Sequence, residues 1–242
     1  MAMTGPEPGT LLFDLKELGR LEEGIFLHRP NRFVALAEVK GKQVRVHVAD
    51  TGRLEEILTP GRPLLLRPNP PGMKTDATLI AARMTEGWVL INTRLHPLIA
   101  RRAIERGVLG FVPRTLKQEV TFGSSRLDYL ADDTYVELKG CSLVLENTCF
   151  FPNAPTVRGT RHLHELIAAR AAGHGAAILI MALRPCRCFA PHPDRDPEFR
   201  RTFYEALEKG VEFRGFHVRI DEALRVVYDG ELGLCEKSSS VS

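Results

Sequence analysis

Three ionisable side chains, Asp128, Glu137 and Lys139, interrupt a stretch that otherwise has the pattern of two short strands. The segments SRLDYL and YVELK flank residues 131–134, and the aspartates in that turn are ordinary turn residues. Counting outward from the turn places Asp128 directly opposite Glu137 on the predicted hairpin. Lys139 falls on the same face, because side chains two residues apart on a strand point to the same side. The sequence therefore predicts that a lysine and two carboxylates converge on one face of a sheet.

A pair of directly opposed carboxylates has a cost and a chemical use. Their repulsion destabilises a hairpin by up to ~1 kcal/mol unless a proton, a cationic side chain or a metal ion relieves it. Carboxylate oxygens this close together suit a hard divalent cation such as Mg²⁺. The alternative is an exposed hairpin whose charged face is simply solvated. The residues alone leave both interpretations open, although the other face of the hairpin is apolar, with Leu127, Tyr129, Val136 and Leu138.

The chain between Arg94 and Arg126 is rich in arginine and lysine and has only two acidic residues, Glu105 and Glu119. Such a local excess of positive charge suits an anionic ligand such as a phosphate backbone. A solvated helix face explains the same pattern equally well. The net charge of +3 for the whole chain identifies no partner.

The 242-residue chain is long enough for two modest domains, and its composition of 44% hydrophobic and 26% charged residues is that of a globular protein. Short strand patterns over residues 24–91 predict a small barrel compatible with an OB-like fold. Residues 92–230 have the order strand, hairpin, helix, buried strand, helix, strand, which predicts a mixed sheet and an α/β (α+β overall) class. Residues 1–23 are expected to be an N-terminal extension and residues 231–242 a disordered tail.

The cysteines and the N-terminal sequence indicate the cellular compartment in which the protein is expected. Five cysteines with irregular spacing argue against a disulfide framework and predict reduced, mostly buried thiols. Cys186 and Cys188 form a lone C-x-C, which has too few ligands for zinc. The chain opens without a signal-peptide pattern, and its longest apolar run, residues 176–183, is too short to span a bilayer. We therefore expect a cytoplasmic protein with no membrane partner.

The spacing Asp-x8-Glu-x-Lys is similar to the catalytic signature of the PD-(D/E)XK nuclease superfamily, in which acidic residues hold Mg²⁺ and the lysine positions the attacking water. A more specific resemblance extends from about Gly24 to Asp229. In this order and spacing, the blocks resemble the sugar fermentation stimulation protein family, the SfsA-type DNA-binding proteins of bacteria and archaea. They are HVADTGRLEE, INTRLHPLIARRAI, EVTFGSSRLDYL, VELKGCSLVLENTCFFPNAPTVRGTRHLHEL and PEFRRTFYEALEKGVE.

The resemblance implies an N-terminal OB-like barrel and a C-terminal PD-(D/E)XK nuclease-like mixed sheet flanked by helices. It also implies a Mg²⁺ or Mn²⁺ site formed by Asp128, Glu137 and Glu119, with Asp128, Glu137 and Lys139 as catalytic residues. DNA without strong sequence preference is the implied partner, and a homo-oligomer is left open. The residues expected to contact nucleic acid are Arg101, Arg102, Arg126, Arg158 and His162.

The helix that carries Arg158 and His162 is predicted to present them on one face, opposite its leucine stripe. Arg161 and Glu165 share that face, and for these two a plain polar helix surface is an equally good account. Two positions depart from the family pattern. Asp50 replaces a neutral amide, and Asn153 replaces a frequently acidic residue, so we expect weaker function if either position contacts phosphate or metal.

Three functions remain open at this point. The first is a Mg²⁺-dependent phosphodiesterase acting on nucleic acid, the second a DNA-binding regulatory protein linked to sugar metabolism without turnover, and the third a hydrolase of small phosphoesters. The acid pair and the lysine favour the first, because opposed carboxylates without a metal would repel a phosphate. OB-like domains commonly bind single strands with aromatic residues. Phe26, Phe33 and Trp88 are the candidates here, and each is of a type more often found in a core.

Overall fold

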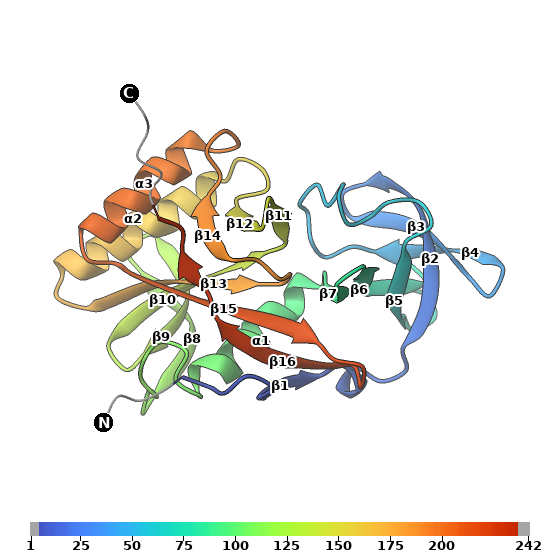
Figure 1. Ribbon diagram of the computed structural model, residues 1–242, viewed down its shortest axis with the longest axis horizontal. Helices are drawn as coiled ribbons and strands as arrows, with labels where there is room; N and C mark the ends of the chain where they lie inside the picture. Colours follow the sequence, from blue (N-terminus) through green and yellow to red (C-terminus); the bar gives the residue numbers. More distant parts are fainter. Residues whose placement is uncertain (1–4, 237–242) are drawn as a thin grey trace. The chain divides into compact units, whose positions relative to one another are not determined.

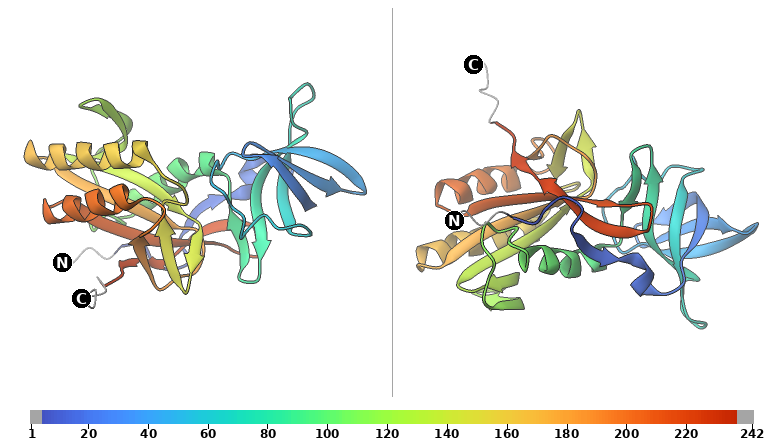
Figure 2. Two further views of the ribbon diagram at one scale, coloured as in Figure 1. Left: turned by 90° about the horizontal axis from the view of Figure 1, so that it is seen from above. Right: turned by 60° about the horizontal axis from the view of Figure 1, so that its bottom comes forward.

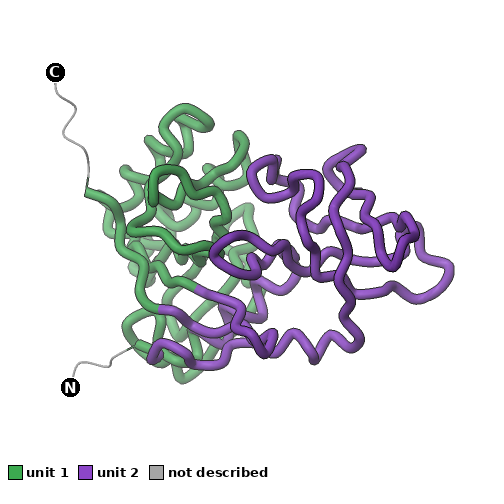
Figure 3. The backbone as a smooth tube through the Cα atoms, turned by 45° about the vertical axis from the view of Figure 1, so that its right-hand side comes forward, with its two compact units in different colours: residues 1–5, 104–217, 230–242 green, residues 6–103, 218–229 purple. Residues whose placement is uncertain are grey.

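A computed structural model of the protein describes residues 5–236. The chain forms two compact units, each assembled from segments that are distant in sequence (Figure 3). The bounds are 6–103 and 218–229 for unit 2, and 104–217 with the residues from 230 onward for unit 1. The division therefore differs from a linear one at residue 91, because the N-terminal extension and residues 92–103 belong with the barrel-containing unit.

Five strands of unit 2 close into a barrel (Figure 1). β2 pairs antiparallel with both β3 and β5, β3 with β4, and β5 with β6. A short parallel pairing of β4 with β6 closes the ring. The strands are β2 (Glu22–Asn31), β3 (Val34–Val39), β4 (Lys42–His47), β5 (Pro63–Pro68) and β6 (Ala77–Met84). The OB-like barrel predicted from the strand pattern is thereby confirmed.

Unit 2 also contains strands outside the five-stranded barrel. In the N-terminal extension, the LFDLKEL segment forms β1 (Leu11–Asp14) and a 3₁₀ helix (Leu15–Leu18) capped by the Asp14 side chain. β1 pairs with β16 (Arg225–Glu231). β7 (Gly87–Leu90) continues the sheet from β6. Chain segments from both ends of the sequence thus contribute strands to this unit.

Unit 1 is built on a mixed sheet with the strand order β15-β13-β10-β9-β8. β9 pairs antiparallel with both β8 and β10. β13 pairs parallel with both β10 and β15. Their bounds are β8 (Leu116–Phe122), β9 (Ser125–Ala131), β10 (Thr134–Cys141), β13 (Gly175–Ala182) and β15 (Glu212–Ile220). The predicted hairpin is β9–β10, and the apolar run of β13 is buried between its neighbours.

Two helices of unit 1, α2 (Val157–Ala171) and α3 (Pro197–Glu208), lie side by side against this sheet (Figures 1 and 2). Both begin at a side chain that caps the first turn: Thr156 accepts from the Gly159 N–H, and Asp196 accepts from the Phe199 N–H. A third helix, α1 (His96–Ile104), precedes β8 in the chain. Within residues 5–236, no helix is long and apolar enough to cross a membrane.

Unit 1 also contains a second, four-stranded sheet, which the sequence pattern did not indicate. Its order is β11-β12-β14-β17. The strands are β11 (Leu143–Leu145), β12 (Thr148–Phe151), β14 (Cys188–Pro191) and β17 (Gly233–Leu234). β17 falls within the tail predicted to be disordered from residue 231, and the rest of that tail, 237–242, lies outside the described residues.

The expectation of reduced cysteines was wrong. Cys141 is bonded to Cys149 and Cys188 to Cys235, which leaves Cys186 as the free thiol. Strand pairing explains the second bond: Cys188 pairs with Gly233, so the chain of β17 delivers Cys235 to it from 47 residues away in sequence. Spacing along the chain does not reveal a contact made through a sheet.

Candidate metal-binding and catalytic site

The β9–β10 hairpin has the predicted register. Leu130 pairs with Tyr135 and Tyr129 with Val136. Beyond these pairs the regular ladder stops, because the Leu138 N–H donates to Oδ2 of Asp128 at 2.7 Å. The Asp128 carboxylate therefore takes the place of a backbone partner and is held at the level of Glu137.

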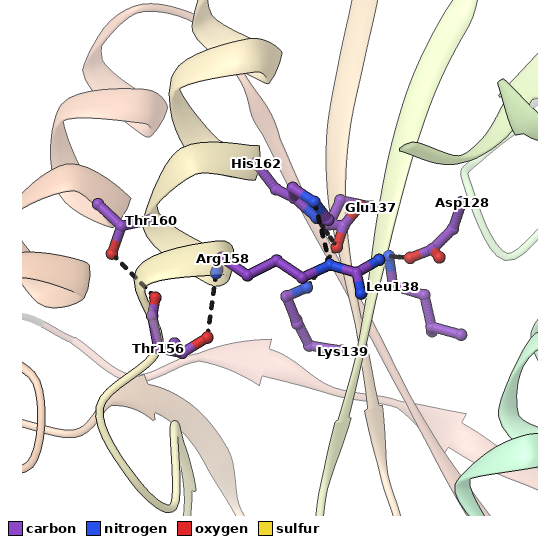
Figure 4. A network of polar contacts seen from close by, with 9 residues as sticks. Asp128, Glu137, Leu138, Lys139, Thr156, Arg158, Thr160 and His162 are labelled. Carbon is purple, nitrogen blue, oxygen red and sulfur yellow. Dashed lines mark hydrogen bonds and ion pairs between the residues drawn. The ribbon is translucent and has the colours of Figure 1, made fainter. Parts of the chain in front are cut away.

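Glu137 is buried, with 2% of the residue exposed, and its two carboxylate oxygens are in different situations. Oε1 forms an ion pair with Nζ of Lys139 and a contact with Nδ1 of His162. Oε2 is buried and has no hydrogen-bond partner. Figure 4 shows Glu137 with His162 and Lys139, beside the Asp128 carboxylate. The site therefore combines one oxygen that has two partners with one buried oxygen that has none.

The two carboxyl groups differ in acidity. Burial, and next the negative charge of Glu137, raise the pKa of Asp128 to about 6, against the opposing effects of Lys139 and the Leu138 N–H. Burial alone would also raise the pKa of Glu137, but the charge of Lys139 and the hydrogen bond from His162 outweigh it and hold that pKa below its usual value. Asp128 is thus the weaker acid of a coupled pair, and added positive charge would stabilise its ionised form.

His162 lies behind Glu137 rather than on the solvent face predicted for it. It is buried on the sheet side of α2, with 2% of the residue exposed. Its Nε2 accepts from Nε of Arg158 at 3.4 Å, while Nδ1 faces Glu137. The two ring nitrogens therefore have different partners, which fixes the orientation of the ring. Because the ring is buried, its position does not fit a direct contact with nucleic acid. Helical periodicity in the sequence did not indicate this burial.

Arg158 is exposed at the start of α2 and extends across the site toward the hairpin (Figure 4). Its guanidinium uses one N–H for His162, which leaves further donors free for an oxyanion. Arg158 is therefore the predicted nucleic-acid contact that the structure brings to the acid pair. The neighbouring Glu165 has a structural contact, because it accepts from the N–H and the hydroxyl of Ser124 in the β8–β9 turn.

Glu119 does not join the acid pair. The β8–β9 register places it beside Asp128, but its backbone has φ of 53°, outside the β region, and its side chain is 68% exposed. There it forms an ion pair with Arg126, another predicted nucleic-acid contact, at 3.4 Å. In the described part of the chain, no three His, Cys, Asp or Glu side chains come together as they would around a metal ion.

The remaining predicted contacts, Arg101 and Arg102, lie on α1 in unit 2. Arg102 donates to the Leu12 carbonyl at 2.9 Å, pairs with Glu17 and lies over the Phe13 ring. It therefore anchors the N-terminal segment, a structural role that the basic pattern did not distinguish from phosphate binding. Arg101 is exposed on the same helix.

The two departures from the family pattern have structural partners. Asn153 accepts from Nη1 of Arg195 through its side-chain oxygen, and its carbonyl accepts from the same nitrogen at 2.9 Å. In unit 2, Oδ1 of Asp50 accepts from the Gly52 N–H at 2.7 Å, and Arg29 donates to the Asp50 carbonyl. Both side chains therefore shape loops.

The three aromatic residues of unit 2 that were considered for base stacking differ in their exposure to solvent. Phe26 is 2% exposed and belongs to the core. Phe33 is 48% exposed, with the Arg32 guanidinium 5.2 Å from its ring centre. Trp88 is partly exposed, with Arg83 at 5.4 Å. Of the three, Phe33 best matches a stacking residue, because its ring is open to solvent and has a cation beside it.

The comparisons with known proteins agree with this architecture. Residues 94–223 match the family model described as the sugar fermentation stimulation protein RE domain, and residues 27–91 match the SfsA N-terminal OB domain. The chain belongs to the sugar fermentation stimulation protein family. Relatives of that name come from Sulfurisphaera tokodaii, 38% identical over 92% of this chain and 96% of the relative, and from Methanococcoides burtonii, 41% identical over 88% and 92%.

A solved structure of a sugar fermentation stimulation protein confirms the fold. SfsA of Pyrococcus furiosus, determined in complex with Ca²⁺, matches with a TM-score of 0.84 at 32% identity and covers 94% of this chain and 100% of that chain. The expected combination of an N-terminal OB domain with a mixed α/β sheet is therefore shown for this chain.

Proposed function

We propose that this member of the sugar fermentation stimulation protein family is a divalent-metal-dependent phosphodiesterase that acts on nucleic acid, with DNA as the expected substrate. The observation that carries the proposal is the buried Oε2 of Glu137, which has no protein partner although Oε1 has two. Leaving a buried polar atom unsatisfied costs roughly 1–3 kcal/mol, and more for a charged group. A bound cation beside Asp128 would remove that cost.

The donor set fits a hard divalent cation. Mg²⁺ is commonly held by one or two carboxylates, with waters and substrate phosphates completing the octahedron. Asp128 and Glu137 supply two such carboxylates, so a third acidic ligand is not needed. The Ca²⁺ named for the Pyrococcus furiosus relative supports a site for an oxygen-ligated divalent ion.

The protein side chains divide the remaining tasks. When bound, the metal ion would lower the pKa of a coordinated water and stabilise charge on the phosphate. Glu137 is held in place through Lys139 and His162, and its unpartnered Oε2 would bind the ion. Lys139 has donors beyond its contact with Glu137, and these orient the attacking water or contact a phosphate oxygen.

Arg158 binds the phosphodiester from the helix side of the site. Its guanidinium is exposed and presents paired N–H groups, a geometry that matches phosphate oxygens. A phosphate held by Arg158 would approach the acid pair only with a cation between them, since like charges otherwise repel. The same requirement argues against a site that binds DNA without metal.

The test combines metal binding with cleavage. Mg²⁺ and Mn²⁺ are titrated by calorimetry into the wild-type protein, Asp128→Asn, Glu137→Gln and the exposed control Glu198→Gln. The same proteins are incubated with end-labelled single- and double-stranded DNA, RNA and bis(p-nitrophenyl) phosphate. We expect metal binding and DNA cleavage in the wild type and the control, and loss of both in the two site variants.

The contrary outcomes separate the other functions. DNA binding that is equal in all four proteins, metal-independent and without product would leave a regulatory DNA-binding protein on a nuclease fold. Cleavage of bis(p-nitrophenyl) phosphate that DNA does not inhibit would indicate a small phosphoester as the substrate. Either result would overturn the proposal.

A further inference from the structure

Unit 1 contains a polar cavity away from the hairpin, lined by residues of β12, β14 and α3 and by the two residues after β17. Its volume is about 520 Å³, within the usual range for small-ligand sites. None of its lining residues belongs to the Asp128–Glu137 site. The cavity therefore needs an explanation of its own.

Strand alternation makes the floor of this cavity. Phe150 on β12 pairs with Ala190 on β14, so the two side chains point to the same face of the small sheet. The intervening residues Cys149 and Phe189 point the other way and are fully buried in the core. The floor therefore combines an aromatic ring with a small residue that leaves space above it.

The helix α3 forms one wall of the cavity, with one of its faces buried in the core and another turned to the cavity. Phe199 and Phe203 are fully buried, while their neighbours Arg200 and Tyr204, one turn apart, line the cavity. The Arg200 guanidinium lies 5.8 Å from the centre of the Tyr204 ring. An aromatic ring and a cation thus face the cavity from one helical turn.

The charges around the cavity favour an anion. Arg187 and Arg200 both line it, and within residues 5–236 neither is in an ion pair. Glu236 is the one acidic side chain in the lining, beside the disulfide-bonded Cys235. Two guanidinium groups without a carboxylate partner provide ready-made donors for phosphate or carboxylate oxygens.

We propose that this cavity binds a small ligand that combines a planar ring with an anionic group, the chemistry of a nucleoside monophosphate. Phe150 and Tyr204 supply ring surfaces for the planar part. Arg187 and Arg200 bind the anionic group. The Glu236 carboxylate accepts from amino or hydroxyl groups of the ligand, and Thr148 adds a hydroxyl at the edge of the same cavity.

The test measures binding of AMP by calorimetry in EDTA, so that no divalent metal takes part. The variants are Arg187→Gln/Arg200→Gln, which removes the cations, and Ala190→Leu, which fills the floor and leaves the charges. Arg201→Gln, on the same helix but outside the cavity, is the control. We expect both cavity variants to weaken AMP binding at least tenfold and the control to leave it unchanged, with circular dichroism checking the fold.

Further ligands show which part of AMP the cavity recognises. Inorganic phosphate lacks the ring and is expected to compete poorly, and UMP tests whether the base matters. Benzoate that binds more tightly than AMP, with the same sensitivity to the variants, would support the shared chemistry and assign a carboxylate as the anion. No binding of AMP or benzoate to the wild type, equal affinity in the arginine double variant, or phosphate competing as well as AMP would overturn the proposal.

Discussion

At the scale of single residues, the candidate site depends on the contacts of His162, which leave the two carboxylate oxygens of Glu137 in different environments. His162 and Lys139 occupy Oε1, and Oε2 is left without a partner. The other ring nitrogen of His162 accepts from Arg158. One buried ring therefore contacts both the carboxylate that we propose as a metal ligand and the guanidinium that we propose as a phosphate contact.

Two substitutions at His162 test its two contacts separately. Asparagine places its amide near the position of Nδ1 and can keep the contact with Glu137, whereas glutamine places its amide near Nε2 and can keep only the contact with Arg158. His162→Asn is expected to keep Mn²⁺ affinity near that of the wild type. His162→Gln is expected to lower it by 10- to 100-fold, the usual cost of losing a partner that orients a metal ligand. Calorimetric titration of Mn²⁺ measures this without any turnover. Equal losses in both variants would show that His162 matters only for packing.

The positions of these residues were predictable in part. The turn and the alternation of β9 and β10 are local, so the sequence placed Asp128 and Glu137 correctly across the hairpin. Glu119 was expected at the site from the family resemblance alone, and in the structure its backbone has a positive φ and its side chain pairs with Arg126. His162 was misplaced because helical periodicity does not tell whether a polar side chain beside Leu163 faces solvent or a buried carboxylate.

At the scale of elements, the small sheet illustrates what local patterns miss. Its strands have two to four residues, and three of its members come from separate parts of the chain. Pairings between such short, distant segments leave no periodic signal in the sequence. The long elements α2, α3 and β13, in contrast, were predicted, because each carries its own apolar pattern.

The Cys188–Cys235 disulfide is expected to hold β17 on the edge of that sheet. It closes a loop across a sequence separation of 47 residues, and a loop of that length restricts the unfolded chain by about 2–4 kcal/mol. Cys188→Ser should therefore lower the urea midpoint of unit 1 and raise amide exchange in residues 232–236. Cys186→Ser is the matched control, because burial raises the pKa of this free thiol to about 11 and keeps it unreactive. Equal midpoints for the two variants would contradict the stabilising role.

At the scale of the whole molecule, the length allowed two domains and the change of pattern after residue 91 suggested them, and the structure divides the chain into two units. No single cut along the chain gives these units, because residues 218–229 return to unit 2 and residues 230–236 then complete unit 1. That return rests on the pairing of β16 with β1, between segments separated by most of the chain. Unit 2 can nevertheless be followed by fluorescence, since the single tryptophan, Trp88, lies in it.

Unit 2 also contains a histidine that should couple its stability to pH. Burial lowers the pKa of His96 to about 4, and its Nε2 has no hydrogen-bond partner. The unfolded chain binds a proton near pH 6.5, whereas the folded chain resists protonation until about pH 4. The free energy of unfolding should therefore fall as the pH drops through this window, by up to ~1.4 kcal/mol per pH unit for one proton.

Urea unfolding followed by Trp88 fluorescence between pH 7 and pH 4.5 measures this dependence in wild type and His96→Gln. Other groups titrate in the same range, and the raised pKa of Asp128 acts in the opposite direction, because the folded state binds that proton first. The difference between the two proteins cancels such contributions, which are common to both. The wild type should lose more stability than His96→Gln as the pH falls. Parallel curves would show that His96 is protonated equally in the folded and unfolded chain, contrary to its burial.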